Sequence, residues 1–241
     1  MFWDLNVPAP VAGAIADTAR RLGFDGVAVN EIVSGKVTAA CRIKPVAVAG
    51  TLKQKTRLTV VLSDSNQISS LSSGNHFLKS YDIVAFRPTT DKLFQQCCMS
   101  LDCDIIALDL SERLPFPIKF PTVHAATQRG VFFELCYGGL IADPASRRQL
   151  MSNMMNVVRV TKGRNIILTS QVIDALHVRS PYDIMNLGAL FGLSHAQARA
   201  ALSTNAISVL ERGQLRRTAQ GVCRAVELSS LDPEKDAWML Q

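Results

Sequence analysis

Two adjacent arginines, Arg147 and Arg148, stand near the start of a helix predicted over 144–160. Asp143 and the proline after it are typical of a helix start, because aspartate accepts hydrogen bonds from the first amides and proline fits the first turn. Amides left free at a helix start attract anions, and two guanidinium groups beside them match the geometry of a phosphate. The alternative is that Arg147 lies over the core and pairs with Asp143 or Glu134.

Further basic residues in the same half of the chain extend this predicted phosphate site. Lys162 and Arg164 flank a glycine in the turn that leads into a strand predicted over 165–170, and Arg179 follows that strand. Together they predict a basic rim at one edge of the fold. The candidate phosphate-binding residues are Arg147, Arg148, Lys162, Arg164 and Arg179, with Arg87 and Arg129 as weaker candidates whose alternative is a structural ion pair.

Basic residues are clustered rather than evenly spread. The 241 residues include 26 Lys and Arg against 20 Asp and Glu, which gives a net charge of +6. Three windows, 32–63, 144–173 and 212–226, contain basic residues and no acid. Such windows favour a polyanionic partner. The alternative is a solvated surface with uneven charge.

Aromatic residues make up only 6% of the chain. They show no spacing that indicates base stacking of the kind found in proteins that bind single strands. Contact with a nucleic acid is therefore expected to go mostly to its backbone and shape, with little sequence readout.

Other chemistries find little support in the residues. The four histidines are not paired at helical or strand spacing, and Asn6 and Pro8 stand where a barrel phosphoesterase would place a His-x-His pair. Cys97 and Cys98 lie on an amphipathic helical pattern, which favours core packing over reactivity. No catalytic residue, metal or cofactor is predicted. The six cysteines show no disulfide framework and indicate reduced thiols, and neither a signal peptide nor a membrane span is expected.

The elements that must position the basic residues alternate between strand and helix. Such repetition predicts a parallel sheet, and the length suits one α/β barrel with extra helices at its C-terminal end. We predict a single domain over 1–228 and a short, frayed polar tail over 229–241. Strand ends hold the sites in such barrels, although they can also simply meet solvent. The predicted strand ends are polar at Asn6, Asn30, Arg87, Asp109, Glu134 and Ser170.

An ordered set of short segments resembles one protein family across roughly residues 2–222. That family is the thirty-kilodalton protein subunit of nuclear ribonuclease P and ribonuclease MRP. The resemblance implies a distorted TIM-like barrel, a metal-free relative of the polymerase-and-histidinol-phosphatase barrel. The matching segments include Leu22-Gly-Phe-Asp-Gly-Val-Ala-Val-Asn30, Thr56-Arg-Leu-Thr-Val-Val-Leu-Ser-Asp64, Arg129-Gly-Val-Phe-Phe-Glu-Leu135, Lys162-Gly-Arg-Asn-Ile-Ile167 and Arg179-Ser-Pro-Tyr-Asp183.

The same resemblance implies a non-catalytic, RNA-binding scaffold subunit of the particle that removes the 5′ leader from precursor tRNA. Its implied partners are ribonuclease P RNA, ribonuclease MRP RNA, a small α/β protein subunit and other ribonuclease P proteins, with precursor tRNA contacted indirectly. It also implies a location in the nucleus and nucleolus and, through MRP, a role in rRNA processing. Two alternatives stay open, a metal-dependent phosphoesterase barrel and a scaffold that binds only proteins.

Overall fold

A computed structural model of the chain describes residues 1–35, 52–71, 75 and 77–217. Seven strands form one parallel sheet in the order of the sequence. After β7, the amide of Gln171 donates to the carbonyl of Asn6 on β1, which nearly closes the sheet into a barrel. The strands are β1 (Trp3–Pro8), β2 (Gly26–Ser34), β3 (Lys53–Leu62), β4 (Ile83–Pro88), β5 (Ile105–Ile106), β6 (Phe132–Cys136) and β7 (Ile166–Thr169). The predicted α/β barrel is confirmed.

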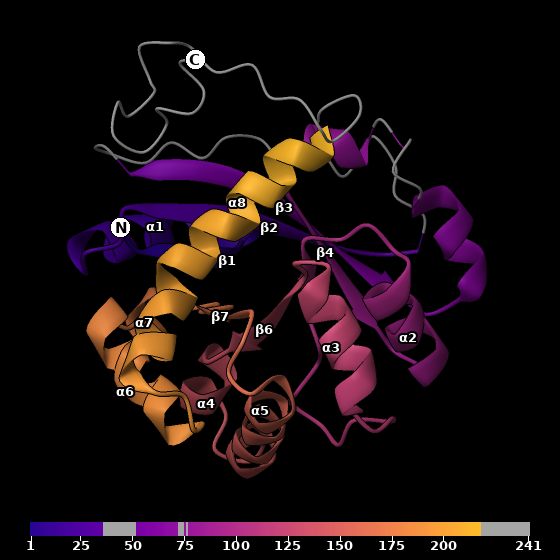
Figure 1. Cartoon of the computed structure of the whole chain (residues 1–241). Helices are drawn as coiled ribbons and strands as arrows, with labels where there is room; N and C mark the ends of the chain where they lie inside the picture. Colours follow the sequence, from indigo (N-terminus) through magenta and orange to yellow (C-terminus); the bar gives the residue numbers. More distant parts are fainter. Residues whose placement is uncertain (36–51, 72–74, 76, 218–241) are drawn as a thin grey trace, which may run out of the picture.

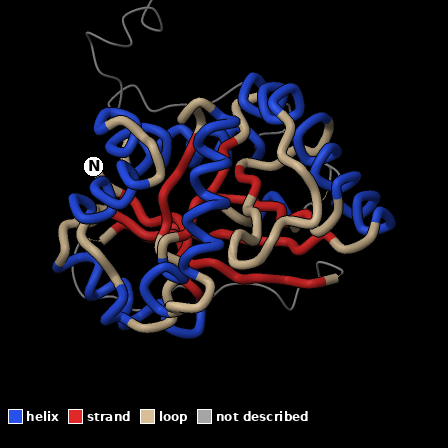
Figure 2. Tube along the Cα trace, turned by 90° about the horizontal axis from the view of Figure 1, so that it is seen from below, coloured by secondary structure: helices blue, strands red, loops and turns tan. Residues whose placement is uncertain are grey.

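Helices flank most of the strands (Figure 1), and the view from below shows one blue helix crossing the middle of the red strands with other helices on either side (Figure 2). They are α1 (Ala12–Arg21), α2 (Asp91–Met99), α3 (Phe120–Gln128), α4 (Gly138–Ala142), α5 (Arg147–Thr161), α6 (Pro181–Leu190), α7 (His195–Leu202) and α8 (Thr204–Arg217). Short 3₁₀ turns lie at Ala9–Val11, Ser65–Leu71, Leu78–Ser80 and Ala175–His177. No helix in the described ranges is long and apolar enough to cross a membrane.

The alternation of strand side chains divides the core into two parts. On β4, Val84 and Phe86 face outward into the large cluster shared with the surrounding helices. Ile83 and Ala85 face inward into a smaller cluster that fills the barrel. Cys97 and Cys98 of α2 are fully buried, as the amphipathic pattern predicted.

The C-terminal helix α8 closes one end of the barrel. Val209 and Ala206 of α8 pack on the inner cluster beside Trp3 of β1. Gly213 lies so close to β4 that a side chain there would collide with the carbonyl of Asp82. The extra helices that the sequence predicted in this region are present as α6, α7 and α8. The predicted tail over 229–241 lies outside the described residues.

Candidate nucleic-acid interface

The interior of the barrel holds a buried ion pair between Arg57 of β3 and Glu134 of β6. Two guanidinium nitrogens donate to the two carboxylate oxygens at 2.5 Å and 2.6 Å, and neither side chain reaches solvent. Arg57 also donates to the carbonyl of Leu5 on β1. Burial raises the pKa of Glu134, but the charge and hydrogen bonds of Arg57 outweigh burial and hold this pKa below its usual range. The pair therefore stays ionised and joins three strands.

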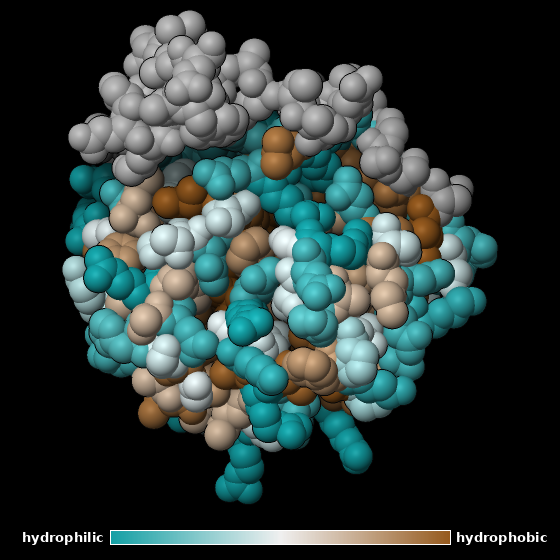
Figure 3. Space-filling model, in the orientation of Figure 1, coloured by the Kyte–Doolittle hydropathy of each residue, from teal (hydrophilic) through white to brown (hydrophobic). Residues whose placement is uncertain are grey.

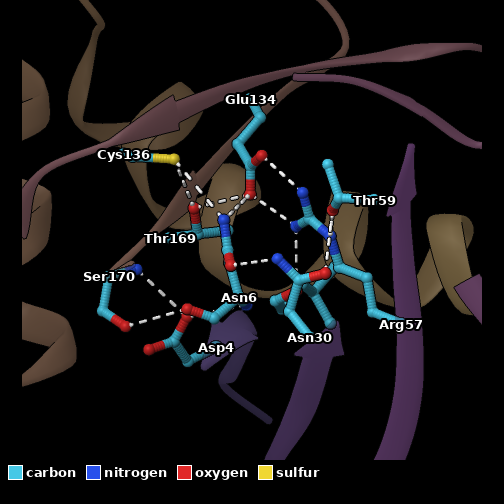
Figure 4. A network of polar contacts seen from close by, with 10 residues as sticks. Asp4, Asn6, Asn30, Arg57, Thr59, Glu134, Cys136, Thr169 and Ser170 are labelled. Carbon is cyan, nitrogen blue, oxygen red and sulfur yellow. Dashed lines mark hydrogen bonds and ion pairs between the residues drawn. The ribbon is translucent and has the colours of Figure 1, made fainter. Parts of the chain in front are cut away.

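Amide and hydroxyl side chains complete this polar network (Figure 4). Asn6 donates to Glu134 at 3.0 Å, and Asn30 donates to the amide oxygen of Asn6 at 2.7 Å. Thr59 donates to Asn30, and Thr169 donates to the Glu134 carboxylate, both at 2.8 Å. These side chains come from five strands and bond to one another. The network is therefore a closed structural centre rather than an open site.

Asp4 is a second carboxyl group in the barrel interior. It accepts hydrogen bonds from the backbone amides of Asn6 and Ser170, and one of its oxygens has no partner among the described residues. Burial raises the pKa of Asp4. Within the described ranges, no group of three or more His, Cys, Asp or Glu could hold a metal ion. Asn6 occupies one of the two positions where a barrel phosphoesterase would place histidine, and its amide is bound to Glu134.

The polar strand ends separate into two groups. Asn6, Asn30, Glu134 and Ser170 are buried, so the alternative that they meet solvent is wrong for these four. The other two, Arg87 and Asp109, line a pocket of about 600 Å³ at the mouth of the barrel. The Nε of Arg87 is buried and has no hydrogen-bond partner in the described part of the chain.

Three of the predicted phosphate-binding arginines donate to backbone carbonyls. Arg129 donates to the carbonyls of Cys97, Cys98 and Leu101, at and just beyond the C-terminal end of α2, and so satisfies carbonyls that a helix end leaves free. Arg147 donates through Nε to the Leu140 carbonyl at 2.6 Å. The alternative pairing of Arg147 with Glu134 is wrong, because Arg57 holds that carboxylate.

Arg179 makes the same kind of contact. Its guanidinium donates to the carbonyls of Leu176 and Val178, and its backbone amide donates to the hydroxyl of Tyr137. These bonds use one guanidinium nitrogen, so the other side-chain nitrogens of Arg179 keep donors for a further acceptor. The geometry of Arg179 and Arg147 is therefore compatible with both a structural role and a phosphate contact.

Other cations on α5 and just beyond it are open to solvent. Arg148, Arg159, Lys162 and Arg164 are exposed, and none forms an ion pair with a carboxylate in the described part of the chain. Arg148, Arg159 and Lys162 share one helical stripe, because their spacing returns to the same face of α5. In Figure 3, hydrophilic side chains project at the lower edge, where Figure 1 places α5.

We define the α5 basic face as this stripe together with Arg164, which lies just beyond the helix: Arg148, Arg159, Lys162 and Arg164. Arg159 lies in a basic window of the sequence but is not among the predicted site residues. Its spacing from Arg148 could have identified it, because residues 148 and 159 lie on the same face of a helix as long as the 15-residue α5. A groove of about 650 Å³ runs along this face and is lined by Met155, Arg159, Lys162 and Gln197, among others.

The basic window at the end of the described chain serves a different purpose. Arg216 of α8 donates to the carboxylate of Asp104 at 3.2 Å and to the carbonyls of Leu78 and Tyr81. Arg212 donates to the carbonyls of Cys103 and Arg129. These arginines fasten α8 to the barrel. In the window 32–63, residues 36–51 lie outside the described residues, and Arg57 belongs to the buried ion pair.

The seven parallel strands, the closed polar interior and the exposed cationic stripe define an α/β barrel protein with a surface suited to a polyanion. Residues 1–218 match the family described as RNase P subunit p30. The chain belongs to this family.

Sequence relatives agree with this assignment, and a solved structure shares the fold. The chain is similar to the Ribonuclease P protein subunit p30 of Mus musculus, with 39% identity over 226 residues that cover 88% of this chain and 84% of that protein. It is also similar to the Ribonuclease P/MRP protein subunit RPP1 of Saccharomyces cerevisiae, with 28% identity covering 90% and 82%. A chain in the cryo-EM structure of archaeal Ribonuclease P with mature tRNA shares the fold, with a TM-score of 0.70 at 17% identity and coverage of 95% and 99%.

Proposed function

We propose that this ribonuclease P subunit is a non-catalytic, RNA-binding scaffold of the particle that removes the 5′ leader from precursor tRNA. The α5 basic face carries the proposal, because its exposed cations lack carboxylate partners in the described part of the chain. Exposed cations without partners are free to neutralise phosphates, and each phosphate contact releases counterions from the RNA. The closed network around Arg57 and Glu134 gives the barrel a rigid centre that supports this face.

Phosphate contacts are assigned in order of availability. Arg148, Arg159, Lys162 and Arg164 are the principal ones, since they are exposed. Arg147 and Arg179 retain free donors beside their carbonyl bonds, and both lie beside α4, where they extend the contact. Arg87 lies at the barrel mouth and Arg129 beneath α2, so both contribute less to RNA binding.

The wider assembly follows from family membership. We propose that the chain binds ribonuclease P RNA, a small α/β protein subunit and other ribonuclease P proteins in the nucleus and nucleolus, and contacts precursor tRNA only indirectly. The name of the Saccharomyces cerevisiae relative includes MRP, which supports sharing of this subunit with ribonuclease MRP. Purifying the tagged protein from its cells and sequencing the associated RNA tests both assignments, and the absence of structured RNA would reject them.

The α5 basic face is tested by Arg148→Ala combined with Arg159→Ala. We expect weaker binding of ribonuclease P RNA and a smaller salt dependence, with the slope of log K against log salt reduced by about 0.7–0.9 for each phosphate that is no longer neutralised. The matched control is Arg20→Ala with Arg21→Ala, because those α1 arginines pair with Asp17 and lie outside the α5 basic face. An unchanged slope in the α5 double variant would favour a scaffold that binds only proteins.

A further inference from the structure

An exposed aromatic pair lies on α3, next to the α5 basic face. Phe120 is 46% exposed. Its ring is stacked with the imidazole of His124, with centroids 5.5 Å apart and an interplanar angle of 8°. The four-residue spacing places both rings on the same side of the helix. Val123 and Ala126 of the same helix face the core, so burial of α3 does not require the two rings.

A cation from α5 joins this pair. The ammonium group of Lys162 lies over the Phe120 ring, 5.0 Å from its centroid. Lys162 ends α5 with a left-handed backbone conformation at φ 55°, which turns the chain at the point where it meets α3. Figure 1 shows α3 and α5 side by side, in agreement with this contact. The Phe120 ring, the imidazole stacked on it and the Lys162 ammonium group are therefore adjacent.

The two segments that carry the aromatic pair and its cation contain no acidic residue. No acidic residue occurs between Arg113 and Phe133, the segment that contains α3, or between Pro144 and Ile173, the segment that contains α5. Lys119, immediately before Phe120, is exposed, and so is Arg164 after α5. A ligand that offers a planar ring and a nearby anion would match both components of this surface.

We infer that Phe120 and His124 form a stacking platform for an unpaired nucleotide of RNA, whose phosphates bind Lys162 and Arg159. The inference deepens the proposed RNA-binding function and depends on it. A single strand is the appropriate ligand, because base faces in a duplex are already stacked on each other, whereas an unpaired base can stack on an aromatic ring. This changes the expectation from the sequence that contacts would go mostly to backbone and shape.

The sequence did not reveal the platform for two reasons. The aromatic residues are few, and a single Phe-to-His spacing on a helix resembles many ordinary surfaces. Lys162, which adds a positive charge beside the two rings, comes from the end of a different helix. Only the packing of α3 against α5 brings the ring and the ammonium group together.

The test measures binding of the full-length chain to a fluorescent oligouridylate of about ten nucleotides, a length within the usual site sizes for single strands. The comparison ligand is an RNA duplex of the same length. For Phe120→Ala we expect oligouridylate to bind about 5- to 150-fold more weakly, the range expected when one base–aromatic stack is removed. Duplex affinity and the salt slope should stay unchanged, because no phosphate contact is removed.

Matched variants separate stacking from damage to the fold. Phe120→Trp keeps an aromatic face and should retain binding, whereas Phe120→Leu keeps apolar area without a ring and should lose it. Tyr182→Ala removes another exposed aromatic, on α6, and should leave oligouridylate binding unchanged. Thermal melting of each variant confirms that it is folded.

The outcomes distinguish this inference from the proposed function. Loss of RNA binding in the Arg148→Ala, Arg159→Ala variant, with no effect of Phe120→Ala, would overturn the platform and leave the RNA-binding face intact. Equal weakening of single-stranded and duplex RNA by Phe120→Ala would also overturn the platform. If neither set of substitutions changes RNA binding, both the platform and the RNA-binding function fail.

Discussion

Arginines on α8 and on α5 come from similar acid-free stretches of sequence, yet the fold places them in opposite environments. Arg216 is nearly buried, pairs with Asp104 and donates to carbonyls around the end of the barrel. Arg148 and Arg159 are exposed and have no carboxylate partner in the described part of the chain. The acids that neutralise α8 come from distant segments. An acid-free window therefore indicates a free positive surface only when no other part of the fold supplies a carboxylate.

Arg57 is the most deeply buried of the structural arginines, and its substitution should have the largest effect on the free energy of unfolding. Arg57→Met leaves the Glu134 carboxyl group buried without its partner, and we expect a loss of about 3–5 kcal/mol in the free energy of unfolding. Urea denaturation measures this loss. The double variant Arg57→Met, Glu134→Met removes both charges and should be more stable than the single variant. A double variant as unstable as the single one would show that packing, not charge, sets the cost.

Arg216→Ala should have the next largest effect. The substitution removes the closest cation from Asp104, but Arg212 remains within 3.8 Å of that carboxylate, so we expect about 2–3 kcal/mol of destabilisation. The control is Arg217→Ala, whose half-exposed pair with Asp82 should contribute less than about 1 kcal/mol. Equal losses in the two variants would contradict the distinction between enclosed and surface arginines.

Lowering the pH should reduce the stability that the buried Arg57–Glu134 ion pair provides, while the cations of the α5 basic face keep their charge. The pKa of Glu134 is lower in the folded state than its unfolded value of about 4.3, so its stabilising contribution is present above that value. This contribution is lost as the pH falls through the folded pKa. Urea unfolding between about pH 6 and pH 3 should show a falling free energy, with a shallower dependence on pH in Glu134→Gln. Parallel pH profiles for the two proteins would argue against the ion pair.

The smallest effect on stability is expected on α5. Arg148→Ala should change the free energy of unfolding by less than about 0.5 kcal/mol, because the side chain is exposed and holds no partner in the described ranges. Its melting temperature should match that of the unmodified chain. A larger loss would place Arg148 with the structural arginines and weaken its assignment to RNA.

Much of the architecture could be predicted because its signals are local. Ser194 and Gln197, three residues apart in the sequence, form a capping box at the start of α7, and Ser180, which precedes a proline, caps α6. The boundaries were less certain where tertiary contacts decide them. In the segment 104–110, only Ile105–Ile106 forms a regular strand, and Asp104 before it is bonded to the amide of Val84 and to Arg216.

Only some residues of the buried polar network could be predicted from the sequence. Polar residues at the strand ends, such as Asn6 and Glu134, could be identified, but both interpretations of them assume contact with ligand or solvent. The missing element was Arg57, which lies in a basic stretch typical of a surface. Its burial is seen only in the folded sheet, where the side chain at this position of β3 points into the barrel and meets Glu134 from β6.

The position of α8 also bears on how the chain is made. Trp3 belongs to the first strand, yet its burial is completed by Ala206 and Val209 of the last described helix. A nascent chain can build successive strand and helix pairs as they leave the ribosome, but the inner cluster stays open at one end until α8 has been synthesised. Completion of the fold is thus a late, long-range event, and a chain that stops before Thr204 would expose the barrel interior to aggregation or chaperones.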